Sequence, residues 1–415
     1  MNAPHAVPGN RWDLLEGMRP DPASVSVVVA HFEQPEQLAR TLLALQHQDH
    51  PADLTQIVVV DDGSASAPTV PAGVTLLAQE DRGFRLAAAR NLGAAAATGD
   101  VLVFLDADTT PEPGFISELT RLPALAPDCV TVGRRRHAAL SGTPLGVDVR
   151  AAARGNELPE PAWLRAAYRE SRDLLDADDR SYRYMIGAVL ACSRSFFADT
   201  DGFDESFDAY GGEDWEWAYR AWLAGGVFAH VPTAVAWHDG ADFAGRATGA
   251  DRRAANAEAI RLAHLIPVPG SRPLGLPPER VDIAVTGPLQ GSAAQIFVAQ
   301  DSVLAGLPGA QLAPADGAGR RFDRVRFTVE ILAPVRAHDG AMARALERIC
   351  RRQLAVLELT DSAGVPLIRI ISTRARSRAR RWQRDDLSES ASLADPGLEA
   401  LVAEPDVEAY LGGWG

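Results

Sequence analysis

Short apolar runs alternate with helical segments along the first two thirds of the chain, and this alternation most constrains the fold. Strand-like runs cover residues 25–30, 57–60, 74–77, 101–105, 185–192 and 227–231, and helical patterns cover 36–48, 86–98, 115–122, 215–224 and 250–265. Strands that alternate with helices form a mostly parallel sheet covered on both faces. We therefore expect an α/β domain, in which residues 140–182 show no clear pattern.

The composition changes along the chain indicate several segments. We expect a flexible N-terminal arm at 1–22, one α/β domain at 23–265 and a linker at 266–280, where residues 266–278 hold five prolines. A smaller α+β domain of unknown role is expected at 281–385, followed by a C-terminal tail at 386–415. Within the domain at 281–385, residues 325–332 are expected to form a strand, 341–354 a helix, and 356–359 with 367–371 a hairpin. Six arginines between 374 and 384 indicate a solvated helix end or tail, with an anionic partner or membrane surface as the alternative.

The charge and the cysteines exclude several classes of protein. The net charge of −14 argues against nucleic acid as the main partner, and all 41 basic residues are arginine. Cys129, Cys192 and Cys350 are too widely spaced for a disulfide framework, which is typical of a reducing cytosol. Residues 1–22 lack the apolar core of a signal peptide, and no apolar run is long enough to cross a membrane. We expect a cytoplasmic protein, either free or peripheral at the inner membrane face.

Two common kinds of nucleotide-binding site are not supported by the sequence, and the end of the first strand argues against one of them. The strand continues as Ala30-His31-Phe32-Glu33 and contains no glycine. A dinucleotide-binding turn needs glycines there, so that the backbone can approach the pyrophosphate. A phosphate-binding loop of the Gly-Lys-Ser/Thr type is also absent, because the chain has no lysine.

Acidic residues follow two of the strands. Asp61-Asp62 ends the run 57–60, and Asp106-Ala107-Asp108 ends the run 101–105. Ligands of open α/β sheets bind at this edge, where a carboxylate can accept a hydrogen bond from a uracil or a ribose. A plain turn is the alternative for Asp62. The second pair can hold Mn2+ or Mg2+, which prefer oxygen ligands and neutralise a leaving diphosphate.

Two arginines start the helical segment 86–98. Arg85 and Arg90 follow Gly83, and both could reach a diphosphate or hold the neighbouring carboxylates. In a chain whose basic residues are all arginine, a pair of surface arginines is an equal alternative.

The densest cluster of polar and aromatic residues comprises the runs Gly202–Glu205 and Tyr210–Trp217. Glu213 and Asp214 lie at the start of a helix, where the helix dipole favours ionised carboxylates, as a general base requires. The preceding glycines leave room for a substrate, whereas two capping acids on an aromatic core helix are the alternative. Farther on, His238 could add an imidazole ligand to a carboxylate site, better suited to Mn2+ than to Mg2+.

The order of these motifs resembles that of inverting glycosyltransferases of family 2, which have a GT-A fold. The similarity covers about residues 25–265. The run Gly211–Trp217 and the later Trp237-His238 also resemble the galactosyltransferase-like C-terminal module of animal β-1,4-galactosyltransferases and bacterial chondroitin-type polymerases.

The resemblance implies a GT-A-type mixed, mostly parallel sheet and a set of site residues. Asp214 would be the catalytic base and Glu213 would orient a substrate. Asp108 and His238 would bind Mn2+ or Mg2+. The donor site would include His31, Asp62, Arg85, Arg90 and Asp106, and the acceptor site Gly212 and Trp215. In place of the family's usual aromatic-Asn pair the chain has His31-Phe32-Glu33, so a base contact from His31 stays open.

The resemblance further implies a metal-dependent inverting transfer of a hexose or N-acetylhexosamine from a nucleotide sugar, UDP-linked by expectation, to an acceptor hydroxyl. The acceptor could be a glycan, a lipid-linked sugar or a small molecule. The alternative is a non-catalytic module that binds a nucleotide sugar or glycan and serves a partner through its C-terminal domain. That domain could equally mediate oligomers.

Overall fold

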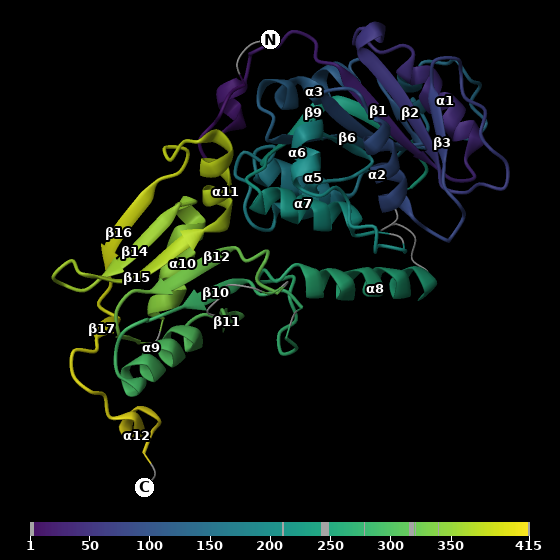
Figure 1. Cartoon of the computed structure of the whole chain (residues 1–415). Coiled ribbons are helices and arrows are strands. Elements are labelled where there is room, and N and C mark those ends of the chain that lie inside the picture. The colour runs from purple at the N-terminus through teal and green to yellow at the C-terminus, as the bar shows by residue number, and fades with distance from the viewer. Residues whose placement is uncertain are drawn as a thin grey trace. The chain divides into compact units, whose positions relative to one another are not determined.

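The computed structural model describes residues 4–209, 211–241, 249–277, 279–314, 319, 321–338 and 340–413. The chain divides into two compact units, Met1–Trp222 with Gly226–Arg261, and Leu223–Gly225 with Leu262–Gly415. We call them the N-terminal unit and the C-terminal unit, and Figure 1 labels most of their helices and strands.

A mixed sheet forms the centre of the N-terminal unit. In the described part, its strands run in the order β3 (Thr75–Ala78), β2 (Thr55–Asp61), β1 (Val25–His31), β4 (Val101–Asp106), β8 (Val189–Ser193), β6 (Cys129–Ala138), β9 (Val227–Asp239) and β5 (Thr109–Pro111), with β7 (Glu157–Leu158) beside β6. Strands β3, β2, β1 and β4 are parallel, whereas β8 is antiparallel to β4 and β6. The expected sheet with flanking helices is confirmed.

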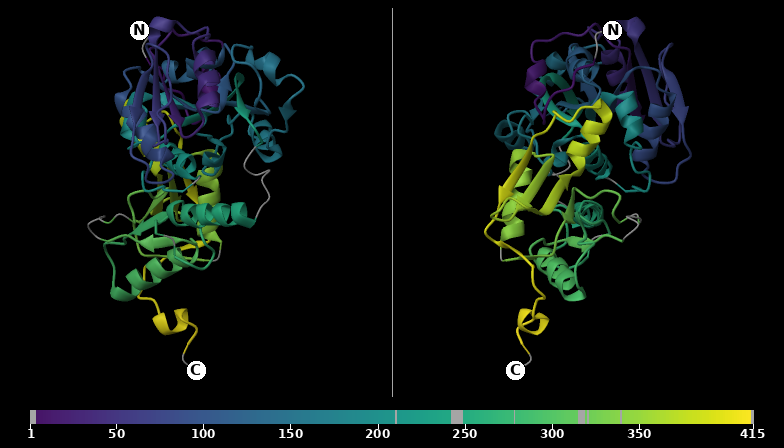
Figure 2. Two further views of the ribbon diagram at one scale, coloured as in Figure 1. Left: turned by 90° about the vertical axis from the view of Figure 1, so that its right-hand side faces the viewer. Right: turned by 60° about the vertical axis from the view of Figure 1, so that its left-hand side comes forward.

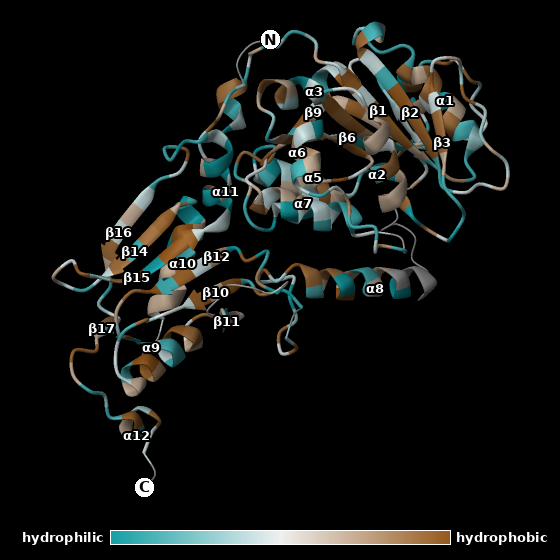
Figure 3. Ribbon diagram, viewed as in Figure 1, coloured by the Kyte–Doolittle hydropathy of each residue, from teal (hydrophilic) through white to brown (hydrophobic). Residues whose placement is uncertain are grey.

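Helices cover this sheet, as two further views show (Figure 2). The helices of the N-terminal unit are α1 (Pro35–Leu45), α2 (Leu86–Ala96), α3 (Phe115–Leu125), α4 (Val149–Ala153), α5 (Ala162–Glu170), α6 (Arg194–Asp199), α7 (Glu213–Leu223) and most of α8 (Gly249–Leu265), which lies away from the sheet (Figure 1). Helix α2 packs on β1 and β2, and α3 packs on β6, β8 and β9. Strands β1 and β2 are mostly apolar (Figure 3), because a strand covered on both faces has no solvent side.

Two segments without a strong sequence pattern are ordered parts of this unit. Residues 140–182 form α4, β7 and α5, followed by the 3-10 helix η3 (Ser181–Tyr184). The N-terminal residues, expected as a flexible arm, include η1 (Trp12–Leu15) and bury Val7 and Leu15 against Leu122 and Leu125 of α3. They are fixed because their few apolar side chains cover one end of α3.

The C-terminal unit has a six-stranded sheet in the described residues, as an α+β domain should. The order is β11 (Ala310–Leu312), β10 (Ile283–Thr286), β12 (Phe327–Ile331), β15 (Pro366–Ser372), β14 (Val356–Thr360) and β16 (Ser390–Ala394), beside the pair β13 (Val335–Ala337) and β17 (Leu398–Ala400). Its helices are α9 (Ala293–Ala305), α10 (Ala341–Arg352), α11 (Thr373–Trp382) and α12 (Val407–Tyr410). The expected hairpin is confirmed as β14 and β15, which are antiparallel.

Residues 386–415 differ from the expected tail. They supply β16, which pairs with β14, and β17, which pairs with β13. The arginine-rich stretch forms helix α11, whose first turn is capped by the hydroxyl of Ser372. Among the described helices, none is long and apolar enough to span a bilayer.

Candidate active site

The carboxyl ends of the parallel strands gather polar residues at one edge of the sheet. In the register of β1 with its neighbours, His31 lies opposite Asp61 and Ala30 lies opposite Asp106. Asp62 follows directly, and its backbone N–H donates to the carbonyl of His31 over 2.8 Å. The strand ends therefore bring the predicted residues of two separate motifs to one place.

Strand pairing also joins Asp108 to His238. The short strand β5 pairs antiparallel with β9, so that Thr109 lies opposite His238. The backbone N–H of Asp239 donates to the carbonyl of Asp108 over 2.9 Å. As a result, Nε2 of His238 lies 3.5 Å from Oδ2 of Asp108.

Hydrogen bonds fix the orientations of the His238 ring and the Asp108 carboxyl. Nδ1 of His238 lies 3.1 Å from the carbonyl oxygen of Gly240, so the proton belongs on Nδ1 and the lone pair of Nε2 faces Asp108. The amide of Gln34 donates to Asp108 over 3.1 Å, and burial raises the pKa of this carboxyl. A bound cation would offset that cost.

The donor set of this pair fits a divalent ion such as Mn2+. One carboxylate and one imidazole suit such an ion, which takes its remaining ligands from water or a substrate. In the described residues, no group of three or more His, Cys, Asp or Glu side chains could hold a metal. The site would therefore depend on a substrate to complete the coordination.

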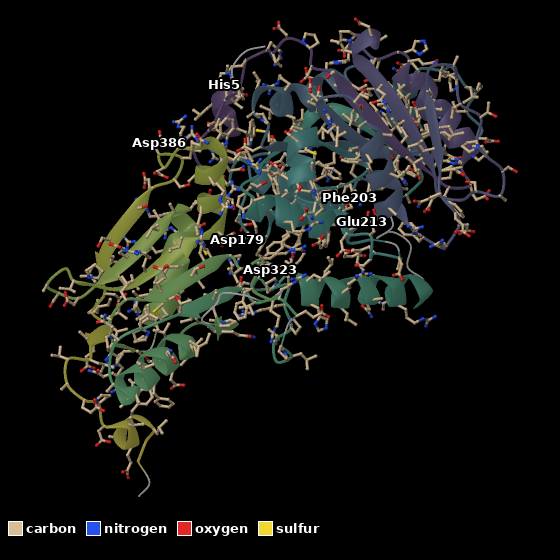
Figure 4. The ribbon with its side chains drawn as sticks, in the orientation of Figure 1. His5, Asp179, Phe203, Glu213, Asp323 and Asp386 are labelled. Carbon is tan, nitrogen blue, oxygen red and sulfur yellow. The ribbon has the colours of Figure 1, made fainter. Side chains whose placement is uncertain are left out.

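Arg90 is buried between two carboxylates and holds both. Its Nη2 donates to Oδ1 of Asp106 and its Nη1 to Oε1 of Glu213, each over 2.8 Å. The guanidinium also lies over the ring of Phe203, 5.5 Å from the centroid, and Figure 4 labels Phe203 and Glu213. The sequence left open whether Arg90 binds a diphosphate or holds the neighbouring carboxylates. Its contacts in the structure are with carboxylates.

The side chain of Asp214 is fixed by two backbone amides. Its Oδ2 accepts from the N–H of Gly187 and its Oδ1 from the N–H of Trp215, each over 2.8 Å. Gly187 is needed there, because a Cβ at this position would lie 2.6 Å from Nη1 of Arg90. Burial raises the pKa of Asp214, while the two amides stabilise its ionised form.

Unlike Asp214, Glu213 has a hydrogen-bond partner among the described residues for only one of its two carboxyl oxygens. Its Oε1 pairs with Arg90, but its Oε2 is buried without a hydrogen-bond partner in the described part of the chain. Burial and the charge of Asp214 raise the pKa of Glu213 to about 7. The two carboxyls titrate as a pair, and the backbone amides make Asp214 the better place for the negative charge.

The glycines before helix α7 allow this placement. Gly211 and Gly212 have φ angles of 93° and 92°, which strongly favour glycine over other residues. Gly212 is buried and its carbonyl accepts from the N–H of Glu216 over 2.9 Å. The turn thus delivers Glu213 and Asp214 to the site at the first turn of the helix.

His31 and Asp62 make contacts within the protein. Nδ1 of His31 lies 2.8 Å from Oδ1 of Asp61, and its Nε2 lies 3.3 Å from the backbone N–H of Gln34, so both ring nitrogens have partners. Asp62 accepts from the backbone N–H of Arg85 over 3.0 Å and from the amide of Gln79. In this arrangement Asp62 anchors the start of α2, and His31 has no ring N–H left for a nucleobase.

Sequence reasoning missed two residues of the site. Asn91 holds the loop at Phe203 by donating to its carbonyl over 2.8 Å and accepting from its N–H over 2.9 Å. Glu258 of α8 lies against Gly211, where a Cβ would come 2.6 Å from Oε2. Burial and then Asp214 raise the pKa of Glu258 to about 7. The Arg90-Asn91 dipeptide could have suggested the first residue, whereas a single glutamate in a polar helix gives no signal.

Two family models match the N-terminal unit. Residues 26–149 match glycosyl transferase family 2, and residues 176–237 match the N-terminal domain of galactosyltransferase. The first segment contains Asp62, Arg90, Asp106 and Asp108, and the second contains Asp214.

Relatives match the same part of the chain. Hyaluronan synthase of Pasteurella multocida is 26% identical over 54% of this chain and 25% of its own length. Chondroitin synthase of Escherichia coli is 28% identical over 52% of this chain and 34% of its own length. N-acetylgalactosaminyltransferase 4 of Drosophila melanogaster is 30% identical over 52% of this chain and 35% of its own length. The chain therefore spans only a quarter to about a third of the length of these relatives.

Solved structures with detectable similarity include two transferases crystallised with Mn2+. GalNAc-T7 with UDP, GalNAc and Mn2+ is 20% identical with a TM-score of 0.40, over 52% of this chain and 44% of that one. A mannosyltransferase of Pyrobaculum calidifontis with GDP-Man and Mn2+ is 20% identical with a TM-score of 0.39, over 61% of this chain and 66% of that one. Over residues 26–149 the chain is therefore similar to glycosyl transferase family 2.

Proposed function

We propose that the N-terminal unit transfers an N-acetylhexosamine or hexose from a UDP-sugar to an acceptor hydroxyl with inversion at the anomeric carbon. One observation supports this most: Arg90 pairs with Glu213, which directly precedes Asp214, and with Asp106, which lies two residues before Asp108. The candidate base and the Asp108–His238 pair therefore flank one ion-paired cluster. A base and a place for a diphosphate are the two parts that such a transfer needs.

Asp214 is the residue that takes the proton. The acceptor hydroxyl attacks the anomeric carbon from the face opposite the nucleotide, and the proton passes to the carboxylate of Asp214 as the new bond forms. Two backbone N–H groups hold this carboxylate in one orientation. Glu213, whose Oε1 is held by Arg90, orients a substrate through its other carboxyl oxygen.

Asp108 and His238 are the residues that would hold a divalent cation. When bound there, such a cation supplies charge stabilisation to the departing nucleoside diphosphate. Arg90 keeps Asp106 and Glu213 in place, and Asp62 fixes the start of α2 beside the donor site.

The donor is proposed from the relatives. They are named hyaluronan synthase, chondroitin synthase and N-acetylgalactosaminyltransferase, which favours a UDP-N-acetylhexosamine. A non-catalytic module that only binds a nucleotide sugar is not favoured, because these relatives are named as synthases and transferases.

The test compares wild type with Asp214→Asn in donor hydrolysis and in transfer, with and without Mn2+. Asparagine keeps the shape and one acceptor oxygen, so we expect folding to be retained and the rate of transfer to fall by roughly 100- to 10,000-fold. Full transfer by the variant would show that Asp214 is not the base. Transfer without any divalent ion would show that the reaction does not need a metal. Binding of UDP without turnover of any UDP-sugar would favour the non-catalytic alternative.

A further inference from the structure

Three aromatic side chains from separate elements come together, and one of them directly follows Asp214 in the chain. They are Trp163 of α5, Tyr184 of η3 and Trp215 of α7, which we call the aromatic platform. The ring of Trp163 lies 6.3 Å from that of Trp215, nearly edge-on at 78°, and 6.4 Å from that of Tyr184.

The platform is open to solvent. Trp163 is 45% exposed, and Tyr184 and Trp215 are half-buried. Large aromatic side chains normally gain stability by burial, and a single exposed one needs no explanation. Three that are adjacent and accessible form a surface suited to a ligand.

Residues behind the platform hold it in shape. Tyr182 is buried, and its ring lies 6.3 Å from Trp215. The hydroxyl of Tyr168 donates to the carbonyl of Tyr184 over 2.6 Å, which fixes the backbone of η3. A ligand would therefore meet rings that are already ordered, and binding would cost little conformational entropy.

The platform shares its backbone with the groups that hold the proposed base. Trp215 follows Asp214 and donates its N–H to Oδ1 over 2.8 Å. Tyr184 lies three residues before Gly187, whose N–H donates to Oδ2 over 2.8 Å. A ring that stacks on the platform would thus bring its hydroxyl groups near Asp214.

Aromatic rings with polar neighbours suit a sugar better than a hydrocarbon chain. The face of an aromatic ring carries partial negative charge and attracts the C–H groups on the apolar face of a pyranose. The phenol of Tyr184 adds a polar atom for the ring's hydroxyls. We propose that the aromatic platform binds a pyranose ring of a saccharide acceptor, so that the acceptor is a glycan. This rests on the proposed transfer.

The variants Trp163→Ala and Trp163→Phe test the platform, with Leu14→Ala as the matched control for an exposed apolar residue elsewhere in the unit. The acceptors are chondroitin and hyaluronan hexasaccharides, and UDP-N-acetylgalactosamine and UDP-N-acetylglucosamine are the donors with Mn2+. We expect Trp163→Ala to raise the KM for the hexasaccharide roughly tenfold. Trp163→Phe should recover most of the affinity, and acceptor-free donor hydrolysis should be unchanged in both.

Binding is also measured by calorimetry with UDP and Mn2+ present, which separates this inference from the proposed function. An unchanged KM in Trp163→Ala, an equal loss of donor hydrolysis, or no binding of either hexasaccharide to wild type overturns the platform. Hexasaccharide binding that depends on Trp163, without turnover of either donor, keeps the platform and overturns the transfer from these donors.

Discussion

Arg90 and Glu213, which are far apart in the chain, form a buried ion pair in which Nη1 lies 2.8 Å from Oε1. The same guanidinium pairs with Asp106, so that one side chain joins helix α2, strand β4 and the start of α7. Because Arg90 and Glu213 are almost wholly buried, neither charge could be left unpaired without a large cost.

Replacing Arg90 should therefore destabilise the N-terminal unit. In Arg90→Ala the carboxylates of Asp106 and Glu213 lose their counter-charge, and the free energy of unfolding should fall by about 3–5 kcal/mol. Urea unfolding at neutral pH measures the change. Arg82→Ala is the control, because Arg82 pairs with Glu80 at the surface and its loss should be close to neutral. Equal midpoints for the two variants would contradict a structural role of Arg90.

The Asp108–His238 pair predicts a specific loss of metal affinity. His238→Ala removes the imidazole whose Nε2 lies 3.5 Å from Asp108, so the affinity for Mn2+ in the presence of UDP should fall roughly 10- to 100-fold. Electron paramagnetic resonance of free Mn2+ measures the binding without an assay of activity. His47→Ala provides the control, because His47 is exposed on the chain after α1. Wild-type affinity in His238→Ala would show that the pair does not hold the ion.

Much of the fold was predictable because its strands are buried on both faces. Strands β1, β2 and β4 are mostly apolar, and the ends of β2 and β4 carry the acidic residues that mark the edge of the sheet. The short strand β5 was not predicted, since three residues carry too little pattern. Its pairing with β9 is nevertheless what brings Asp108 to His238.

The partners within the site were harder to predict than its members. The sequence left Arg90 with a diphosphate or a carboxylate as partner, and only the fold brings Glu213 to its side chain. Two members of the aromatic platform were missed in the same way, because Trp163 comes from the segment whose pattern was unclear and Tyr184 follows shortly after it. Edge strands such as β16 were missed because polar residues alternate with small ones there.

Gly187 should tolerate no side chain. A Cβ would lie 2.6 Å from Nη1 of Arg90, so Gly187→Ala must displace either the guanidinium or the amide that holds Asp214. We expect the free energy of unfolding to fall by about 1–3 kcal/mol. We also expect the kcat of transfer to fall by a larger factor than the affinity for UDP. Calorimetric titration of UDP and transfer kinetics measure the two effects. Gly114→Ala is the control, because a Cβ there would meet its nearest neighbour at 3.7 Å; a similar kcat in both variants would contradict the role of Gly187.

Glu258 should make stability depend on pH. Burial and then the charge of Asp214 raise its pKa from 4.5 to about 7 in the folded protein. Between these values the unfolded chain loses a proton that the folded chain keeps, so the stabilisation present at low pH is lost as the pH rises through about 7. Glu258→Gln cannot ionise, so its Tm relative to wild type should increase over this interval and level off above it. Differential scanning calorimetry measures the difference, and Glu347→Gln, which removes an exposed carboxyl from α10, controls for the loss of one negative charge. If the two variants follow the same pH profile, Glu258 does not titrate in the folded protein as its burial against Gly211 implies.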